Sequence, residues 1–331
     1  MSKEYKKILL FFLILFSVYC ALSVGLTWDE EYHLKQGKVI MDYLFSFGKI
    51  NKEYYYRENY SAIYWSLSYL ISKQFPSQYQ VEITHLINLT FSLGTIFGIG
   101  KIGKELFNKK IGKIFFLLLF FYPIFFGHMA INCKDTILAF SHIWITYLLI
   151  KYLKKQNIRS KANKYIISLA VLAAISTGIQ LVFLGSLIPI ILLFLLDILI
   201  IKKFSNINFN IKIFLYDFIK CFFIFYLLLI LFWIDTHSNI FFLPINILFS
   251  TFSENYWTGW PFNLIAGNYY LSTEVPKNYL LINFLFKSPE YILICYSLFT
   301  FLIFNKFFKQ KIIFFYYKIL FIISILLFPI F

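Results

Sequence analysis

The side chains best suited to chemistry lie in residues 27–38, which read TWDEEYHLKQGK. Asp29, Glu30, Glu31 and His33 follow directly after a long apolar run. Charged groups at the end of a membrane span must be solvated or paired, and beside a pocket they can bind a cation, a sugar or a proton. If a helix begins here, Glu30 and His33 share one face. The alternative is structural, with Asp29 capping the helix and the two glutamates favoured in its first turn by the helix dipole.

A second polar segment, GHMAINCKDTILAF, covers residues 127–140 and holds His128, Asn132, Lys134 and Asp135. It lies at the joint between two apolar runs, where the Lys134 ammonium could receive an anion such as a lipid phosphate. The alternative is that Lys134 and Asp135 pair with each other at the membrane interface. The segment therefore predicts either a phosphate site or a structural ion pair.

A third polar segment, residues 252–291, is rich in aromatic side chains and in turn-forming glycine and proline. Trp257 and Tyr279 are two of these aromatics, which could stack on sugar rings or belong to an interfacial aromatic belt. Glycine and proline at this density indicate ordered turns. We interpret the segment as a cover over a cleft.

Metal-binding patterns are weak in this chain. Glu30 with His33 and Glu82 with His85 both read Glu-x-x-His, as in di-iron bundles, but no apolar run offers the two further glutamates that such a centre needs. The four cysteines are far apart, which favours neither a disulfide framework nor a zinc site.

The composition indicates an integral membrane protein. The chain is 60% hydrophobic and 22% aromatic, with only 14% charged residues, far from the usage of soluble domains. Its net charge of +15 comes from basic clusters between apolar runs, which is typical of loops on the cytoplasmic side and not of a nucleic-acid groove. We therefore expect a lipid bilayer as a partner and exclude nucleic acid.

Apolar periodicity predicts an all-α, polytopic protein with about nine spans in a single domain, residues 1–331. The predicted spans are residues 8–26, 83–102, 111–126, 136–153, 165–183, 187–201, 214–233, 291–304 and 312–331. Basic residues place the amino terminus inside, so the loops at about 27–82, 127–135 and 235–288 lie outside, the first with helices against the membrane. The chain ends within an apolar run, and a further carboxyl-terminal portion is consistent with this.

These three outer segments, in this order, resemble bacterial members of glycosyltransferase family 39, the dolichyl-phosphate-mannose-protein mannosyltransferase-like group of the polytopic GT-C class. The resemblance is carried by TWDEEYHLKQGK, by GHMAINCKDTILAF, and by the EVPKNYL to KSPE stretch late in the chain. It implies an inverting transfer of a sugar from a polyprenyl-phosphate donor to a protein, lipid or glycan acceptor. It also implies a cell-membrane protein whose active site faces the periplasm.

The resemblance also implies roles for single residues. The acid after the first span serves as general base, which maps onto Asp29, with Glu30 as the adjacent acid of the motif. The second acidic motif maps onto Asp135, with Lys134 toward the donor phosphate. Members often carry arginine where this chain has Gln180, which predicts weaker phosphate binding here. The predicted substrate-binding residues are His33, His128, Asn132, Lys134, Asp135, Gln180, Trp257 and Tyr279.

The chemistry can also be argued from the residues. A glycosyl phosphate carries its own leaving group, so the enzyme must supply a base for the acceptor hydroxyl and cations for the departing phosphate. Asp29 can be the base, and Lys134, His128 or a divalent ion can hold the phosphate. If a metal is used, Asp29, Glu30 and Asp135 are its candidate ligands, and carboxylates favour Mg or Mn. The alternatives are a transporter or lipid-handling protein using the same acids, or a family relative without activity.

Overall fold

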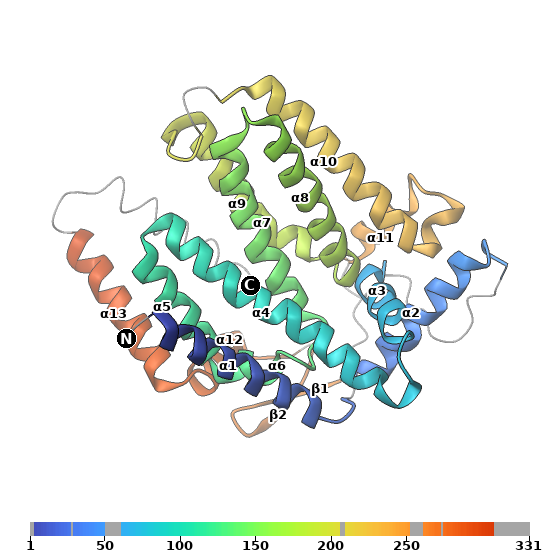
Figure 1. Ribbon diagram of the computed structural model, residues 1–331, viewed down its shortest axis with the longest axis horizontal. Coiled ribbons are helices and arrows are strands. Elements are labelled where there is room, and N and C mark those ends of the chain that lie inside the picture. The colour runs from blue at the N-terminus through green and yellow to red at the C-terminus, as the bar shows by residue number, and fades with distance from the viewer. Residues whose placement is uncertain are drawn as a thin grey trace.

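The computed structural model describes residues 3–27, 29–49, 61–205, 209–251, 261–272 and 274–307. These residues are nearly all helical (Figure 1). The helices are α1 (Lys3–Ser23), α2 (Glu30–Phe45), α3 (Ile63–Ser72), η1 (Ser77–Tyr79), α4 (Gln80–Leu106), α5 (Lys109–Phe120), α6 (Pro123–His128), α7 (Asp135–Lys155), α8 (Arg159–Ile179), α9 (Phe183–Leu196), η2 (Asp197–Ile201), α10 (Ile211–Phe232), η3 (Ile234–Ser238), α11 (Leu243–Thr251), α12 (Tyr279–Lys287) and α13 (Glu290–Phe307).

Five helices in the described part of the chain are long and apolar enough to cross a bilayer. They are Ser77–Leu106, Asp135–Lys155, Arg159–Ile179, Phe183–Ile201 and Ile211–Phe232. The protein is thus of the helical membrane class, as its composition predicts. The expectation of about nine spans is not confirmed, since the apolar helix Lys7–Ser23 is shorter and the predicted span 312–331 lies outside the described residues.

The predicted span 111–126 is wrong, because the chain bends there. Helix α5 ends at Phe120, and α6 starts afresh with Pro123 as its first residue. Tyr122, just before the proline, is extended with φ −75° and ψ 110°. A proline ring disfavours helical geometry in the preceding residue and cannot donate to a continuing helix. The apolar run is therefore split into two short helices.

The long helices pack into one bundle whose connections alternate between its two ends (Figure 1). Helix α4 packs against α5 and α7, and α8 lies between α7 and α10. The end of the bundle where α1 and α8 finish and α4 and α7 begin is called here the site end. The short helices α2 and α3 pack on each other there, and α3 also contacts α4 and α8.

Helices α2 and α3 approach closely at Gly37. A Cβ on this glycine would lie 2.3 Å from the backbone oxygen of Trp65, so no larger residue fits without a shift of the backbone. Around this contact Ile40, Tyr64 and Ile137 form part of one buried apolar cluster with residues of α8. The packing therefore joins α2, α3, α7 and α8 rather than leaving α3 as a helix that only lies on a membrane.

The opposite end of the bundle is held by an ion pair between a buried carboxylate and a half-buried guanidinium. The Arg159 guanidinium donates to both Asp217 carboxylate oxygens, at 2.6 and 2.8 Å, and the Tyr152 hydroxyl donates to the same carboxylate at 2.8 Å. The sequence spacing suggests instead that Asp217 pairs with Lys220, whose ammonium donates to Asn163. Asp217 pairs with Arg159 because the planar guanidinium group can donate to both carboxylate oxygens at once.

A small antiparallel hairpin in the third polar segment is missing from the sequence-based expectation. Strands β1 (Phe262–Ile265) and β2 (Asn268–Leu271) pair in register, Phe262 with Leu271. The two linking residues, Ala266 and Gly267, both have positive φ, 49° and 86°, as a tight hairpin turn of the primed type requires. The hairpin leads on to α12, which contacts β1.

Candidate functional site

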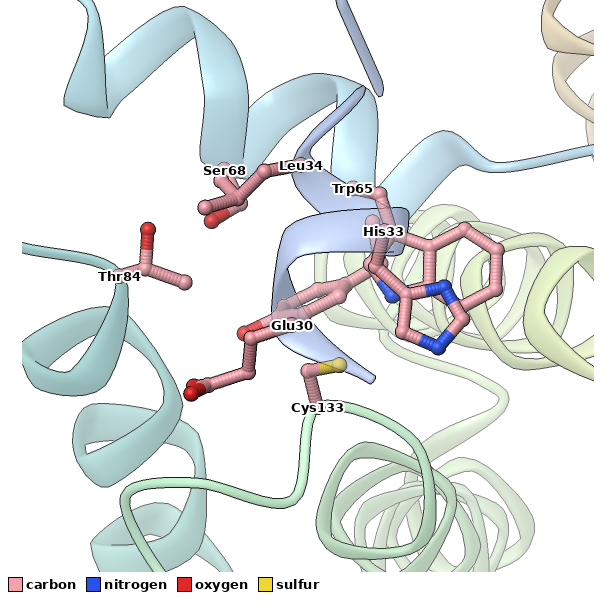
Figure 2. A pocket seen from close by; sticks show the side chains of 8 residues that line it. Glu30, His33, Leu34, Trp65, Ser68, Thr84 and Cys133 are labelled. Carbon is pink, nitrogen blue, oxygen red and sulfur yellow. The ribbon is translucent and has the colours of Figure 1, made fainter. Parts of the chain in front are cut away.

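A pocket of about 230 Å³ lies at the site end, between the starts of α2, α3 and α4 and the turn before α7 (Figure 2). It is lined by Glu30, His33, Leu34, Tyr64, Trp65, Ser68, Thr84 and Cys133. Glu30 and His33 belong to the first polar motif of the sequence, and Cys133 to the second. The structure thus brings residues more than a hundred positions apart to one pocket.

Glu30 is the buried carboxylate of this pocket. It stands in the first turn of α2 with 2% of its surface exposed. The backbone N–H and the hydroxyl of Thr27 both donate to its Oε2, at 2.8 Å each. Figure 2 shows the carboxylate pointing toward the helix that carries Thr84. A buried carboxylate needs partners of this kind because its charge is otherwise costly to remove from water.

The main partner of Glu30 is His85, one residue after Thr84 on α4. The His85 ring is fully buried; its Nε2 hydrogen-bonds to Oε2 of Glu30 at 3.1 Å and lies 2.9 Å from Oε1, and its Nδ1 lies 3.0 Å from the carbonyl oxygen of Ala21 in α1. A carbonyl oxygen only accepts, so Nδ1 carries a hydrogen. Nε2 and the carboxylate then share one further proton, because two lone pairs facing each other at this distance would repel. Glu30 and His85 therefore form a proton-holding pair.

His85 is the site residue that sequence reasoning missed. It is visible there only as part of the second Glu-x-x-His pattern, which points to metal binding but lacks the further glutamates of a metal centre. The partner of His85 is not Glu82 in that pattern but Glu30, 55 positions earlier. No sequence spacing signals such a contact, since it depends on the first turn of α2 lying against α4.

The opposite wall of the pocket is aromatic. The His33 ring is buried and stacked on Trp65, with centroids 4.0 Å apart and planes 11° from parallel. The Cys133 sulfur points toward this stack (Figure 2). Burial raises the pKa of the Cys133 thiol to about 12, although a hydrogen bond from Trp65 opposes the shift. Cys133 is therefore a neutral thiol at physiological pH and not a nucleophile.

Tyr64 and Ser68 add hydroxyl groups to the lining. Burial, and then the nearby Cys133 and Glu30, raise the pKa of Tyr64 well above its usual value, so its hydroxyl stays protonated and bonds to Asn88. The Ser68 hydroxyl is 3% exposed and has no hydrogen-bond partner among the described residues. A buried hydroxyl left open toward a pocket is a ready contact for a ligand hydroxyl.

Asp29 is exposed at the edge of this site, immediately before Glu30. It stands at the residue preceding α2, but its side chain makes no capping hydrogen bond. The capping hydrogen bond of the structural interpretation is therefore not formed by the Asp29 side chain, although Glu30 and Glu31 lie in the first turn of α2 as that interpretation expects. Glu31, the third acid of the motif, is on the surface and pairs with Lys35 at 2.5 Å.

Asn132 in the second motif organises the start of α7. Its side-chain oxygen accepts from the backbone N–H groups of Lys134 and Asp135, at 3.1 and 2.8 Å, and its amide donates to the Asp135 carboxylate at 3.0 Å. Asp135 and His128 are exposed, and Lys134 is half-buried. These residues stand at the site end, but they do not line the pocket.

The remaining predicted site residues are less closely tied to the pocket. Gln180 is exposed directly after α8 ends, also at the site end. Tyr279 is half-buried as the first residue of α12 and is not part of the pocket lining. Trp257 lies outside the described residues. The structure thus joins Glu30 and His33 in one pocket and places Asp29 beside them.

A metal centre is not assembled in the described part of the structure. No three His, Cys, Asp or Glu side chains there come close enough to share a metal ion. Asp29, Glu30 and Asp135 therefore do not form a ready-made ligand set, and the Mg or Mn ion stays a prediction of the sequence.

Comparison with known proteins finds no matching family, no similar curated protein and no similar solved structure. The resemblance to glycosyltransferase family 39 accordingly depends on the three motifs alone.

Proposed function

We propose that this protein is a membrane glycosyltransferase that transfers a sugar from a polyprenyl-phosphate donor to an acceptor at the outer face of the cell membrane. The observation that carries the proposal is the shared pocket. The acidic motif after α1 and the motif before α7, which resemble the two catalytic motifs of one enzyme family, line the same cavity through Glu30 and Cys133.

The geometry supports Asp29 rather than Glu30 as the base. Glu30 already accepts two hydrogen bonds from Thr27 and shares a proton with His85. Taking a second proton would leave a net positive charge on this buried pair, which is costly in a desolvated site. Asp29 is exposed, has no capping bond, and is one residue away. It can accept the proton of an acceptor hydroxyl, while Glu30 and His85 hold its segment in place.

The departing phosphate must be held by cations at the same end of the bundle. Lys134 and His128 are the candidates, and Gln180 offers an uncharged amide nearby in the fold. The Ser68 hydroxyl offers a polar contact to a ligand, beside the aromatic wall that the His33–Trp65 stack forms. This division of roles matches what an activated glycosyl phosphate requires, since it needs a base and anion stabilisation but no acid.

Transfer of radiolabelled sugar from a panel of polyprenyl-phosphate donors tests the proposal. Asp29→Asn should lower turnover by about 10²–10⁴-fold, the usual contribution of a general base, while donor binding is retained. Glu31→Gln is the matched control, because it removes a neighbouring carboxylate that is exposed and paired with Lys35. Equal turnover by the Asp29→Asn protein would contradict the assigned base. A folded wild-type protein that transfers no sugar from any donor would favour a relative without activity.

A transporter is the second candidate, and one observation favours it. His142 lies inside the span α7, is 6% exposed, and neither ring nitrogen has a partner among the described residues. Ionisable side chains buried in spans often mark proton or substrate paths. Proton uptake into proteoliposomes under an imposed pH gradient measures this activity. Uptake by the wild-type protein that is lost in the His142→Phe protein would support transport. No uptake by the wild-type protein would contradict it.

A further inference from the structure

Three lysine side chains surround one carboxylate at the end of the bundle opposite the site end. Lys151 and Lys154 on α7 both donate to the Glu105 carboxylate on α4, Lys154 at 2.9 Å. Lys101, one turn before Glu105, has no carboxylate partner among the described residues. Its ammonium lies over the Tyr147 ring at 5.5 Å, and the Lys151 ammonium lies over the same ring at 5.3 Å. We call Lys101, Lys151 and Lys154, together with Glu105, the lysine cluster.

Helix dipoles account for only part of this positive charge. Both α4 and α7 end here, and the negative end of a helix dipole favours lysines in the last turn. Lys154 lies in that turn, whereas Lys101 and Lys151 lie before it. Both belong to the candidate spans Ser77–Leu106 and Asp135–Lys155, where an ammonium group is costly and often marks function. Three ammonium groups against one carboxylate leave positive charge unbalanced at this place.

The other acids that the structure describes at this end, from α4 to α10, are buried and already bonded. They are Asp197 and Asp217, 0% and 2% exposed. The Asp217 carboxylate pairs with Arg159, and Asp197 accepts from the backbone N–H groups of Phe204 and Ser205, at 3.1 and 2.8 Å. They do not offset the exposed lysines of this end, which are Lys101, Lys104, Lys109, Lys110, Lys113, Lys161, Lys164, Lys202 and Lys212. The surface beside the lysine cluster is therefore strongly cationic.

An aromatic wall lies next to the lysine cluster, on the side toward the middle of the spans. Trp144 and Tyr147 are half-buried and stand two turns and one turn before Lys151 on α7. The Lys101 ammonium lies over the Trp144 ring at 4.7 Å, and the indole N–H donates to the Gly94 carbonyl at 3.0 Å, which fixes the ring. Cationic groups above aromatic rings are typical of the boundary between headgroups and hydrocarbon in a bilayer. A soluble anion would use the charges but not this wall.

From these observations we infer that the lysine cluster binds the headgroup phosphate of an anionic phospholipid, with an acyl chain along Trp144 and Tyr147. Basic pockets between spans bind such headgroups, and each lysine near an anionic membrane surface adds to the attraction. The phosphate balances the positive charge that Glu105 leaves over. The inference does not rest on sugar transfer, because the lysine cluster and the site pocket lie at opposite ends of the bundle.

Quenching of tryptophan fluorescence by brominated lipids tests this assignment, because Trp144 is part of the site. The purified full-length protein in detergent is titrated with dibromo-phosphatidylglycerol or dibromo-phosphatidylcholine, and the quenching that is lost in the Trp144→Phe protein reports on the lysine cluster. We expect phosphatidylglycerol to quench Trp144 at a several-fold lower mole fraction than phosphatidylcholine, and the difference to shrink at high salt, which screens charges. Equal quenching by both lipids, or displacement of phosphatidylglycerol by inorganic phosphate, would overturn the assignment.

Lys101→Gln removes one charge of the cluster without breaking an ion pair, and thermal unfolding checks that the variant folds. We expect its binding of phosphatidylglycerol to weaken about fivefold, the usual contribution of one lysine near an anionic surface. Lys101→Arg keeps the charge and should bind like wild type. Lys161→Gln is the matched control, because it removes an exposed lysine from the start of α8 at the same end. Equal losses in Lys101→Gln and Lys161→Gln would show an attraction to the whole cationic surface and would overturn the site.

Glu105→Gln separates lipid binding from a purely structural role of the cluster. The substitution removes the carboxylate that competes with the phosphate for Lys151 and Lys154. We therefore expect phosphatidylglycerol to bind about fivefold more tightly, while the midpoint of thermal unfolding in lipid-free detergent falls because two ion pairs are lost. Weaker lipid binding by a folded Glu105→Gln protein would refute the lipid site. If this variant does not fold, the comparison of Lys101→Gln with Lys161→Gln decides.

Discussion

Replacing His85 by alanine is the most informative single perturbation, because it removes the partner of the buried Glu30. The variant loses the bond to the Ala21 carbonyl, about 1 kcal/mol for an ordinary hydrogen bond. It also leaves the carboxylate buried without its imidazole, and breaking a buried pair in this way costs about 3–5 kcal/mol. The two hydrogen bonds from Thr27 to the Glu30 carboxylate remain and reduce the loss of stability. We therefore expect a decrease of about 3 kcal/mol in the free energy of unfolding.

The assay is denaturation in mixed SDS micelles, followed by tryptophan fluorescence, for a double-mutant cycle of His85→Ala and Glu30→Gln. The neutral amide that Glu30→Gln introduces needs no imidazole, so the second substitution should recover part of the loss. A coupling energy of about 1–3 kcal/mol is expected for groups in direct contact. Thr90→Ala, on an exposed position of α4, is the control and should unfold like wild type. Strictly additive losses would refute the proton-holding pair.

Three further predictions concern the surroundings of the site. Gly37→Ala should destabilise the protein by about 1–3 kcal/mol and quench or shift tryptophan fluorescence, because its Cβ would meet the Trp65 carbonyl at 2.3 Å. Arg159→Met should cost about 2 kcal/mol of unfolding free energy, less than a fully buried pair because the arginine side chain is 40% exposed. Burial raises the pKa of the Cys133 thiol to about 12. At pH values below this pKa, the rate of its reaction with a small methanethiosulfonate should rise about tenfold for each unit increase in pH, since only the thiolate attacks.

Each of these three has its own control. Gly25→Ala should be silent, since a Cβ there meets no atom within 4 Å, and a silent Gly37→Ala would contradict the close approach of α2 and α3. Lys161→Met removes an exposed charge from the same helix as Arg159. An equal loss of unfolding free energy in the Lys161→Met and Arg159→Met proteins would show that the ion pair with Asp217 does not stabilise the fold. A pH-independent labelling rate at Cys133 would show that opening of the structure, and not ionisation, limits the reaction.

Much of the helical framework could be predicted from apolar runs. The predicted spans 83–102, 136–153 and 214–233 fall within or close to α4, α7 and α10, because a bilayer-length apolar run has few alternatives to a helix. The boundary between the predicted spans 165–183 and 187–201 falls about one helical turn earlier, with α8 ending at Ile179 and α9 starting at Phe183. The failure at Pro123 has a local cause that was readable in the sequence, as was the Ala266–Gly267 turn.

The site was predictable only in part. Glu30 and His33 were expected to share a helix face, and both line the pocket. The partners that determine their chemistry come from elsewhere in the chain, His85 for Glu30 and Trp65 for His33. Such contacts depend on which helix faces pack together, and a single sequence carries no direct signal of that choice.

A helical membrane protein, with its unusual polar residues gathered in a few segments beside apolar runs, is already evident from the sequence. Composition and the length of apolar runs are sufficient for that, since the bilayer leaves the backbone little choice. Which of the acids is buried and which is exposed follows from the packing of the helices. Glu30 points inward to His85 and Thr27, while its neighbour Asp29 remains at the surface. Two adjacent carboxylates acquire different chemistry because the packing of α1, α2 and α4 buries only one of them against an imidazole.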